Sequence, residues 1–129
     1  MRDFHLPGRS AVYATNGMCA TSHPLATTAA LDILKSGGNA VDAAIAGAVL
    51  LGICEPQMTG LGGDMFALIQ KHPSADVVAL NGSGRAPQAA NATALRAKGL
   101  STIPLHSAEA ITVPGAVDGF CRMAEDLGT

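Results

Sequence analysis

The spacing of apolar residues in the first third of the chain predicts a helix over residues 22–36. Leucine, isoleucine and alanine recur there three or four positions apart, which places them on one face of a helix. Ser22 is expected to cap this helix, and Pro24 fits its first turn, where a missing backbone donor breaks no hydrogen bond. Gly37 and Gly38 end it, because glycine readily adopts the left-handed conformation that follows a helix.

A second helix is predicted over residues 41–54, where almost every residue is Ala, Val, Ile or Leu. Asn39 is expected to cap it, and Asp42 completes a variant of the capping box, so Asp42 is interpreted as a capping residue. Because polar side chains are missing from all its faces, we expect this helix to be central and buried on most sides. The apolar run is too short to span a bilayer, which needs roughly 20 residues.

Two apolar segments at residues 65–70 and 77–80 are separated by a polar turn and predict a β-hairpin. A weak helix is expected within residues 88–100, and a final helix begins after Pro114. The order of helix, helix, hairpin and helix predicts a mixed α+β arrangement. The apolar face expected for the final helix consists of Val117, Phe120, Met123 and Ala124.

The start of the chain is polar, and residues 1–10 are expected to form an extended arm. Short apolar stretches at residues 11–14 and 17–21 predict two strands around a turn at Asn16 and Gly17, since Asn-Gly strongly favours tight turns. The first residues contain no apolar segment typical of a secretory signal. We therefore expect a cytoplasmic protein without a membrane partner, with a periplasmic or secreted protein as the alternative if the start of the chain was trimmed.

The composition fits a folded domain and argues against several classes of function. Apolar residues make up 48% and charged residues 14% of the 129 residues, which is enough apolar material for a core. A formal net charge of −2, with no cluster of Lys and Arg, argues against binding of nucleic acid. Aromatic residues, at 3%, are too few for a base-stacking surface.

Cysteine and histidine provide no signal for a disulfide framework or a metal site. Cys19, Cys54 and Cys121 are odd in number and widely spaced, and the histidines lack metal-ligand spacing, so we expect neither metal nor cofactor. Cys19 and Cys54 lie in apolar stretches and are interpreted as core residues. His23 is interpreted as a residue that starts the first helix rather than as a catalytic base.

Gly60, Gly62 and Gly63 first suggest a loop that binds phosphate. Dinucleotide and phosphate sites place such a loop between a strand and the N-terminus of a following helix, whereas here the predicted order is helix, loop, strand. We favour a structural interpretation, in which these glycines permit positive φ and let the backbone pass close to the second helix. Nucleotide binding stays as a weaker hypothesis.

Arg85 is the cation most suited to binding a substrate. It lies in a glycine-rich loop, residues 81–87, directly after the second strand of the hairpin. A guanidinium can bind a carboxylate through two parallel hydrogen bonds, which Lys cannot reproduce. The alternative is structural: Arg85 pairs with Asp64, Asp76 or another acid and fixes the loop. The spacing of the residues alone favours this structural alternative.

Five stretches of the chain stand out together: residues 17–26 (GMCATSHPLA), 34–44 (LKSGGNAVDAA), 55–64 (EPQMTGLGGD), 81–87 (NGSGRAP) and 113–120 (VPGAVDGF). Together they resemble the amino-terminal part of the gamma-glutamyltransferase family. They follow the family's order over residues 17–120, and their combination makes the match specific.

The resemblance implies an N-terminal-nucleophile (Ntn) hydrolase with an αββα sandwich, of which residues 1–129 form an incomplete, N-terminal part of the large subunit. In that family a precursor cleaves itself into a large and a small subunit. The new N-terminal Thr of the small subunit is the nucleophile, and its own amine is the base. A gamma-glutamyl group passes from glutathione or a related amide to this Thr, and then to water or an amino acid. The Thr lies beyond residue 129, so no residue of this chain is assigned a catalytic role.

The resemblance also changes the interpretation of Arg85, because the family's substrate-carboxylate arginine falls at this position. Binding of substrate by Arg85 then becomes the favoured hypothesis. The expected partners are a small gamma-glutamyl molecule, the remainder of the large subunit, and the small subunit of the same precursor. Well-studied transferases carry an acid beside this arginine, in a loop like Asp-Phe-Arg-Glu, whereas here Gly84 and Ala86 flank it.

Two alternatives stay open, one because of this departure and one because the nucleophile is missing from this chain. The glycine-rich loop resembles the acylase-like branch of the family, whose members act on other amides. The other alternative is a truncated, non-catalytic module with a structural or binding role only. We expect the chain to be a fragment of a longer protein and to be inactive in isolation.

Overall fold

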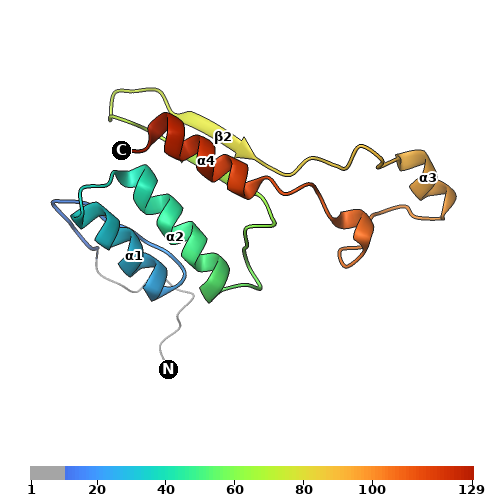
Figure 1. Cartoon of the computed structure of the whole chain (residues 1–129), viewed down its shortest axis with the longest axis horizontal. Helices are drawn as coiled ribbons and strands as arrows, with labels where there is room; N and C mark the ends of the chain where they lie inside the picture. The colour runs from blue at the N-terminus through green and yellow to red at the C-terminus, as the bar shows by residue number, and fades with distance from the viewer. Residues whose placement is uncertain (1–10) are drawn as a thin grey trace.

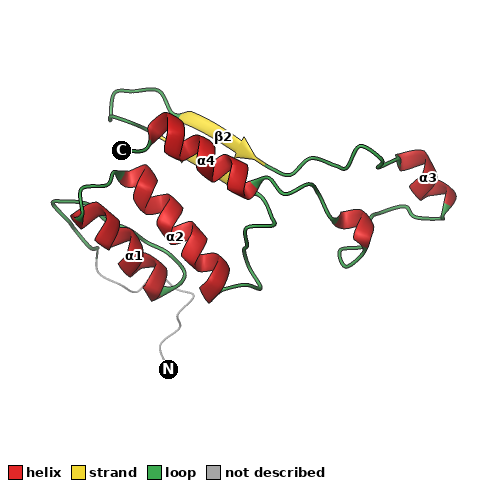
Figure 2. Cartoon of the chain, in the orientation of Figure 1, coloured by secondary structure: helices red, strands yellow, loops and turns green. Residues whose placement is uncertain are grey.

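A computed structural model describes residues 11–129 as four α-helices, one 3-10 helix and a two-stranded sheet (Figure 1, Figure 2). The helices are α1 (Pro24–Lys35), α2 (Ala40–Cys54), α3 (Ala92–Ala97), η1 (Ala108–Ala110, 3-10) and α4 (Ala116–Leu127). The strands β1 (Met65–Ile69) and β2 (Val78–Gly82) pair as an antiparallel hairpin. The α+β class, the predicted helices and the predicted hairpin are confirmed. The arm expected at residues 1–10 lies outside the described residues.

Helices α1 and α2 pack against each other through small residues. Ala26 and Ala30 of α1 are fully buried. A Cβ added to Gly47 of α2 would lie 3.6 Å from the carbonyl oxygen of Ala26 and 3.7 Å from the Cβ of Ala30. The two backbones therefore approach closely, and the helices lie side by side (Figure 1).

The start of α1 differs from the prediction. His23 caps the helix, because its Nδ1 accepts the N–H of Leu25 at 3.2 Å. The expectation that Ser22 is the cap is therefore wrong, whereas the interpretation of His23 as a helix-start residue is confirmed. The Ser22 hydroxyl instead donates to Glu55 Oε2 at 2.6 Å and connects the start of α1 to the end of α2.

The capping box at the start of α2 is confirmed. Asn39 Oδ1 accepts the N–H groups of Val41 (2.8 Å) and Asp42 (3.1 Å), and Asp42 Oδ2 accepts the N–H of Asn39 at 2.8 Å. The same two residues hold the end of α4, since Asn39 Nδ2 donates to the carbonyl of Leu127 at 2.7 Å and the Thr129 hydroxyl donates to Asp42. The hydrogen bonds from Thr129 and from Asn39 lower the pKa of Asp42.

The core lies between the inner face of the hairpin and helices α2 and α4. Along β1, Met65, Ala67 and Ile69 face this core, and Met65 pairs with Gly82 of β2. On α4 the buried residues are Ala116, Gly119 and Met123. The buried face predicted for α4 is wrong at two positions, because Val117 is 46% exposed and Ala124 is exposed. The helix is rotated so that Gly119, which has no side chain, lies against Met65.

Large apolar surfaces stay uncovered within the described residues. Helix α2 lies between α1 and α4 as predicted, but it is mostly half-buried and Ile53 is 74% exposed, so the expected burial on most sides is not met. The outer face of β1 carries Phe66 and Leu68, which are 69% and 79% exposed. No helix of residues 11–129 is long and apolar enough to cross a bilayer.

Two connecting segments complete the described chain. Residues 83–113 extend away from the helices and the hairpin and carry α3 and η1 (Figure 1). The strands predicted at residues 11–14 and 17–21 are absent. This segment meets α1 instead of a partner strand: a Cβ at Gly17 would lie 3.2 Å from Leu34 Cδ1, and the Thr21 hydroxyl binds the hydroxyl of Thr27 at 2.7 Å.

Candidate functional site

Arg85 follows the end of β2, and its main chain is held from both sides. The N–H of the preceding residue, Gly84, donates to Asp64 Oδ1 at 2.6 Å. The carbonyl of Arg85 accepts the N–H of Val113 at 2.9 Å. Two segments distant in sequence therefore fix the position from which the Arg85 side chain extends.

The glycine-rich loop before β1 holds the start of α4 as well. The carbonyl of Gly63 accepts the N–H groups of Gly115 (3.1 Å) and Ala116 (3.0 Å). A Cβ added at Gly115 would lie 2.5 Å from the carbonyl oxygen of Gly82. The loop at residues 60–64, the end of β2 and the start of α4 thus meet at one point beside Arg85.

Gly84 allows this meeting because it has no side chain. A Cβ at this position would overlap the Thr112 Oγ1 and the carbonyl oxygen of Val113. The segment before Arg85 can therefore lie against the segment before α4 only with glycine here. The glycine-rich character of the loop has a packing role in addition to any role in binding.

The structural interpretation of the Gly60–Gly63 loop is correct in one part and wrong in the other. Positive φ occurs only at Gly17, Gly37 and Gly99 among residues 11–129, so the expected positive φ in this loop is wrong. The close passage along α2 is confirmed, since a Cβ on Gly52 would lie 3.5 Å from Gly60 Cα. The order of α2, loop and β1 is also as predicted, so no helix N-terminus follows these glycines.

The Arg85 guanidinium is exposed and forms no ion pair with any acid of residues 11–129. Neither of the two acids named as its possible structural partners pairs with it. Asp64 accepts a backbone N–H, and Asp76 lies at the opposite end of the hairpin, before β2. Among residues 11–129, hydrogen bonds donated by the main-chain N–H groups of Gly84 and Val113 fix the loop. The ion pair expected in the structural alternative is not formed there.

The remaining candidate residues are three cysteines and one histidine. Cys19 and Cys54 are half-buried rather than core residues, Cys121 is exposed, and all three are free thiols. His23 is used in the cap of α1. Residues 11–129 contain no group of three or more His, Cys, Asp or Glu side chains able to hold a metal.

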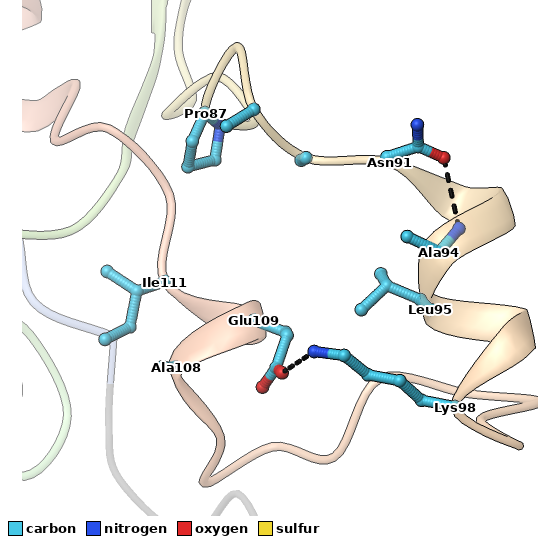
Figure 3. Close-up of a pocket in the computed structure, with 10 residues that line it drawn as sticks. Pro87, Asn91, Ala94, Leu95, Lys98, Ala108, Glu109 and Ile111 are labelled. Atoms are coloured by element: carbon cyan, nitrogen blue, oxygen red, sulfur yellow. Dashed lines mark hydrogen bonds and ion pairs between the residues drawn. The ribbon is translucent and has the colours of Figure 1, made fainter.

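A cavity of about 280 Å³ lies between α3 and η1 (Figure 3). Its wall includes Pro87, two residues after Arg85, and otherwise consists mainly of Ala, Leu and Ile side chains. Lys98 and Glu109 form an ion pair of 3.5 Å across it. The pKa of Glu109 is lowered, first by its own backbone N–H and then by the hydroxyl of Ser107 and by Lys98. The cavity offers apolar contacts and one ion pair.

The sequence of residues 26–129, most of the chain, matches the gamma-glutamyltranspeptidase family. The chain belongs to this family. The resemblance found in its five stretches is thereby confirmed, and the family is one of Ntn hydrolases.

Three similar proteins differ in the reaction that their names describe. The glutathione hydrolase-like proenzyme of Bacillus subtilis is 43% identical over 118 residues, which cover 91% of this chain and 22% of that protein. The crystal structure of the cephalosporin acylase of Bacillus halodurans superposes with a TM-score of 0.86 at 46% identity, covering 98% of this chain and 24% of that one. The crystal structure of the Helicobacter pylori gamma-glutamyltranspeptidase superposes with a TM-score of 0.80 at 32% identity, covering 93% of this chain and 35% of that one.

The chain thus spans only about a fifth of the length of the curated relatives it matches, 22% and 20% for two of them. Its fold matches the N-terminal part of these larger structures.

Proposed function

We propose that residues 1–129 form the incomplete N-terminal part of the large subunit of an enzyme that transfers or hydrolyses gamma-glutamyl groups of glutathione or a related amide. In this proposal the Arg85 guanidinium binds the carboxylate of the acyl donor. The observation that carries it is an exposed guanidinium with no acid partner among residues 11–129, on a main chain held from both sides by Asp64 and Val113.

The chemistry assigns binding to Arg85 and bond breaking to a residue outside this chain. Two parallel N–H groups of the guanidinium hold the two oxygens of the donor carboxylate. The hydroxyl of the N-terminal Thr attacks the amide carbonyl while the amine of that Thr takes the hydroxyl proton. The leaving amine departs with this proton, and an acyl-Thr ester remains. Water or an amino acid then attacks the ester and releases the free Thr hydroxyl.

The proposed partners are the remainder of the large subunit and the small subunit of the same precursor. Two observations support them. The relatives carry the name proenzyme, and this chain spans about a fifth of their length. Phe66 and Leu68 expose an apolar sheet face, and exposed apolar patches mark surfaces that other segments cover. We therefore expect the isolated 129-residue chain to lack activity.

A second candidate function is the hydrolysis of another amide. The acylase of Bacillus halodurans is similar over almost the whole chain, at 46% identity. In addition, Gly84 and Ala86 flank Arg85, so neither sequence neighbour supplies a carboxylate for an amine of the donor. A donor with a carboxylate but without an α-amino group is compatible with such a loop, because Arg85 needs only the carboxylate.

The test uses the complete open reading frame that encodes this chain. The purified product is first examined by mass spectrometry for cleavage into two subunits. Turnover is then compared for gamma-glutamyl-p-nitroanilide, its glutaryl analogue that lacks the α-amine, and a neutral acyl anilide. Preference for the first supports gamma-glutamyl transfer, and equal use of the first two supports the acylase function.

The role of Arg85 is tested in the matured enzyme with the best of these donors. Arg85→Ala should raise KM about tenfold or more with a smaller effect on kcat, since a hydrogen bond to a charged group contributes roughly 1.5–3 kcal/mol. Arg96→Ala, which removes an exposed arginine of α3, is the matched control and should leave KM unchanged. An unchanged KM for Arg85→Ala contradicts the role of Arg85. A reading frame that ends at residue 129 contradicts the enzyme proposal and leaves the non-catalytic module.

A further inference from the structure

We infer that Asp64 is a positioning residue for Arg85: its carboxylate holds the loop from which the guanidinium reaches the donor. The inference rests on the proposed function of Arg85 and adds a residue that acts through it. The contact that carries it is the 2.6 Å hydrogen bond from the N–H of Gly84 to Asp64 Oδ1. Gly84 and Asp64 are 20 residues apart, so the bond joins two separate segments.

The bond is of a strong kind. A carboxylate that accepts a backbone N–H forms a charge-assisted hydrogen bond, which is shorter and stronger than a bond between neutral groups. Asp64 is well placed to accept it, because it lies between Gly63, whose carbonyl holds the start of α4, and Met65, the first residue of β1 and part of the core. The acceptor therefore stands on a segment that is fixed on both sides.

Besides Asp64, the main chain of this loop is held by the N–H of Ser83, which donates to Asn81 Oδ1 at 2.9 Å, and by the close packing of Gly84 against residues 112–113. Ser83 and Gly84 are followed by an exposed segment, residues 85–91, which leads to α3. In the absence of the Asp64 carboxylate, the bond between the Arg85 carbonyl and the Val113 N–H stays as the fixed point next to the guanidinium. The segment before Arg85 then loses its link to residue 64, and the direction of the Arg85 side chain is less sharply defined.

The expected consequence is weaker donor binding with a nearly unchanged chemical step. A bidentate contact between guanidinium and carboxylate depends on the direction of both N–H groups, so a misdirected arginine loses part of the contact. The donor carboxylate is distant from the donor's reacting carbonyl. The loss of binding energy is therefore the same in the bound donor and in the transition state. Such a loss raises KM and leaves kcat almost unaltered.

The experiment uses the matured full-length enzyme and the best donor of the panel above. Asp64→Ala should raise KM roughly threefold to tenfold, which corresponds to the loss of one hydrogen bond. Asp64→Asn keeps an oxygen acceptor for the Gly84 N–H and should raise KM less. Asp76→Ala removes an exposed acid at the far end of the hairpin and should leave KM unchanged. Thermal unfolding of each variant shows whether a change of KM accompanies loss of fold.

A double mutant separates positioning from a general structural effect. If Asp64 acts through Arg85, Asp64→Ala causes no further rise of KM in an Arg85→Ala background, because coupled residues are not additive. The inference is overturned if Asp64→Ala raises KM by the same factor with and without Arg85→Ala, or if Asp64→Ala alone leaves KM unchanged. The role of Arg85 stands in both cases. An unchanged KM for Arg85→Ala overturns both.

Discussion

Asn39 connects the start of α2 to the end of α4, and its removal provides a quantitative test of the fold. Its Oδ1 accepts the N–H groups of Val41 and Asp42, and its Nδ2 donates to the carbonyl of Leu127 at 2.7 Å. The change Asn39→Ala removes the cap of α2 and the bond between the helices together. Because Asn39 is half-buried, water replaces these bonds only in part.

The magnitude follows from the two separate contributions. Loss of an N-cap costs about 1 kcal/mol, and loss of the hydrogen bond to Leu127 costs about 1 kcal/mol more. We therefore expect Asn39→Ala to lower the free energy of unfolding by about 2 kcal/mol. Asn39→Ser keeps a capping oxygen and loses the amide donor, so it should cost about 1 kcal/mol.

Asn91 provides the matched control. It caps α3 in the same way, with Oδ1 accepting the N–H groups of Thr93 (2.9 Å) and Ala94 (3.1 Å), but no hydrogen bond ties it to another helix among residues 11–129. Helix α3 has six residues and lies away from the packed helices (Figure 1). Asn91→Ala should therefore unfold α3 locally and lower the global free energy of unfolding by less than about 0.5 kcal/mol.

The assay is urea unfolding followed by circular dichroism at 222 nm, with the slope m compared between variants. Equal losses for Asn39→Ala and Asn39→Ser would mean that the capping oxygen contributes nothing, and an unchanged stability of Asn39→Ser would mean that the bond to Leu127 contributes nothing. If Asn91→Ala lowered the free energy of unfolding as much as Asn39→Ala, the reasoning would be refuted. Loss of a helix cap would then have the same effect whether or not the cap is bonded to a second helix.

Two further predictions concern the two ends of α4. Hydrogen bonds from Thr129 and from Asn39 lower the pKa of Asp42 below 3.8, so this stabilisation is present above that pH and is lost as the pH falls through the lower folded-state value. Asp42→Asn should flatten the fall of the urea midpoint as the pH decreases below about 5, and parallel curves would contradict this. Gly115→Ala places a Cβ 2.5 Å from the last carbonyl of β2 and should cost about 1–3 kcal/mol of unfolding free energy. At Gly62 a Cβ meets nothing within 4 Å, so Gly62→Ala should change that energy by less than about 0.5 kcal/mol, and equal effects would be inconsistent with close packing at the start of α4.

The elements that could be predicted from the sequence are those whose signals are local. The cap of α2 and the glycines after α1 act within one turn of a helix, so a single stretch of sequence contains the whole signal. The choice between Ser22 and His23 as the cap of α1 is not local, because Glu55 at the end of α2 takes the Ser22 hydroxyl. The buried face of α4 likewise depends on Met65, which fits against Gly119 and so selects the rotation of the helix.

The candidate site shows the same division. Arg85 could be found from its glycine-rich loop and from the resemblance to a family. The hydrogen bonds that hold its main chain could not be predicted. They connect the loop to Asp64 and Val113, which are more than a dozen residues away and meet the loop only in the tertiary fold. Spacing suggested Asp64 as an ion-pair partner of the guanidinium, and the structure places its carboxylate on a backbone N–H instead.

That difference bears directly on whether Arg85 can bind an anion. An arginine that is paired with an acid has part of its charge balanced, as for Arg122, whose guanidinium lies 3.8 Å from Glu125 and 3.7 Å from Asp126 on the surface of α4. An incoming carboxylate would have to displace such an acid. At Arg85 the nearby carboxylate of Asp64 is directed to the Gly84 N–H, so it fixes the main chain and leaves the two outer N–H groups of the guanidinium unoccupied by acids of residues 11–129. Rigidity of the loop and availability of the charge therefore come from different groups, and a site that selects a donor by its carboxylate requires both.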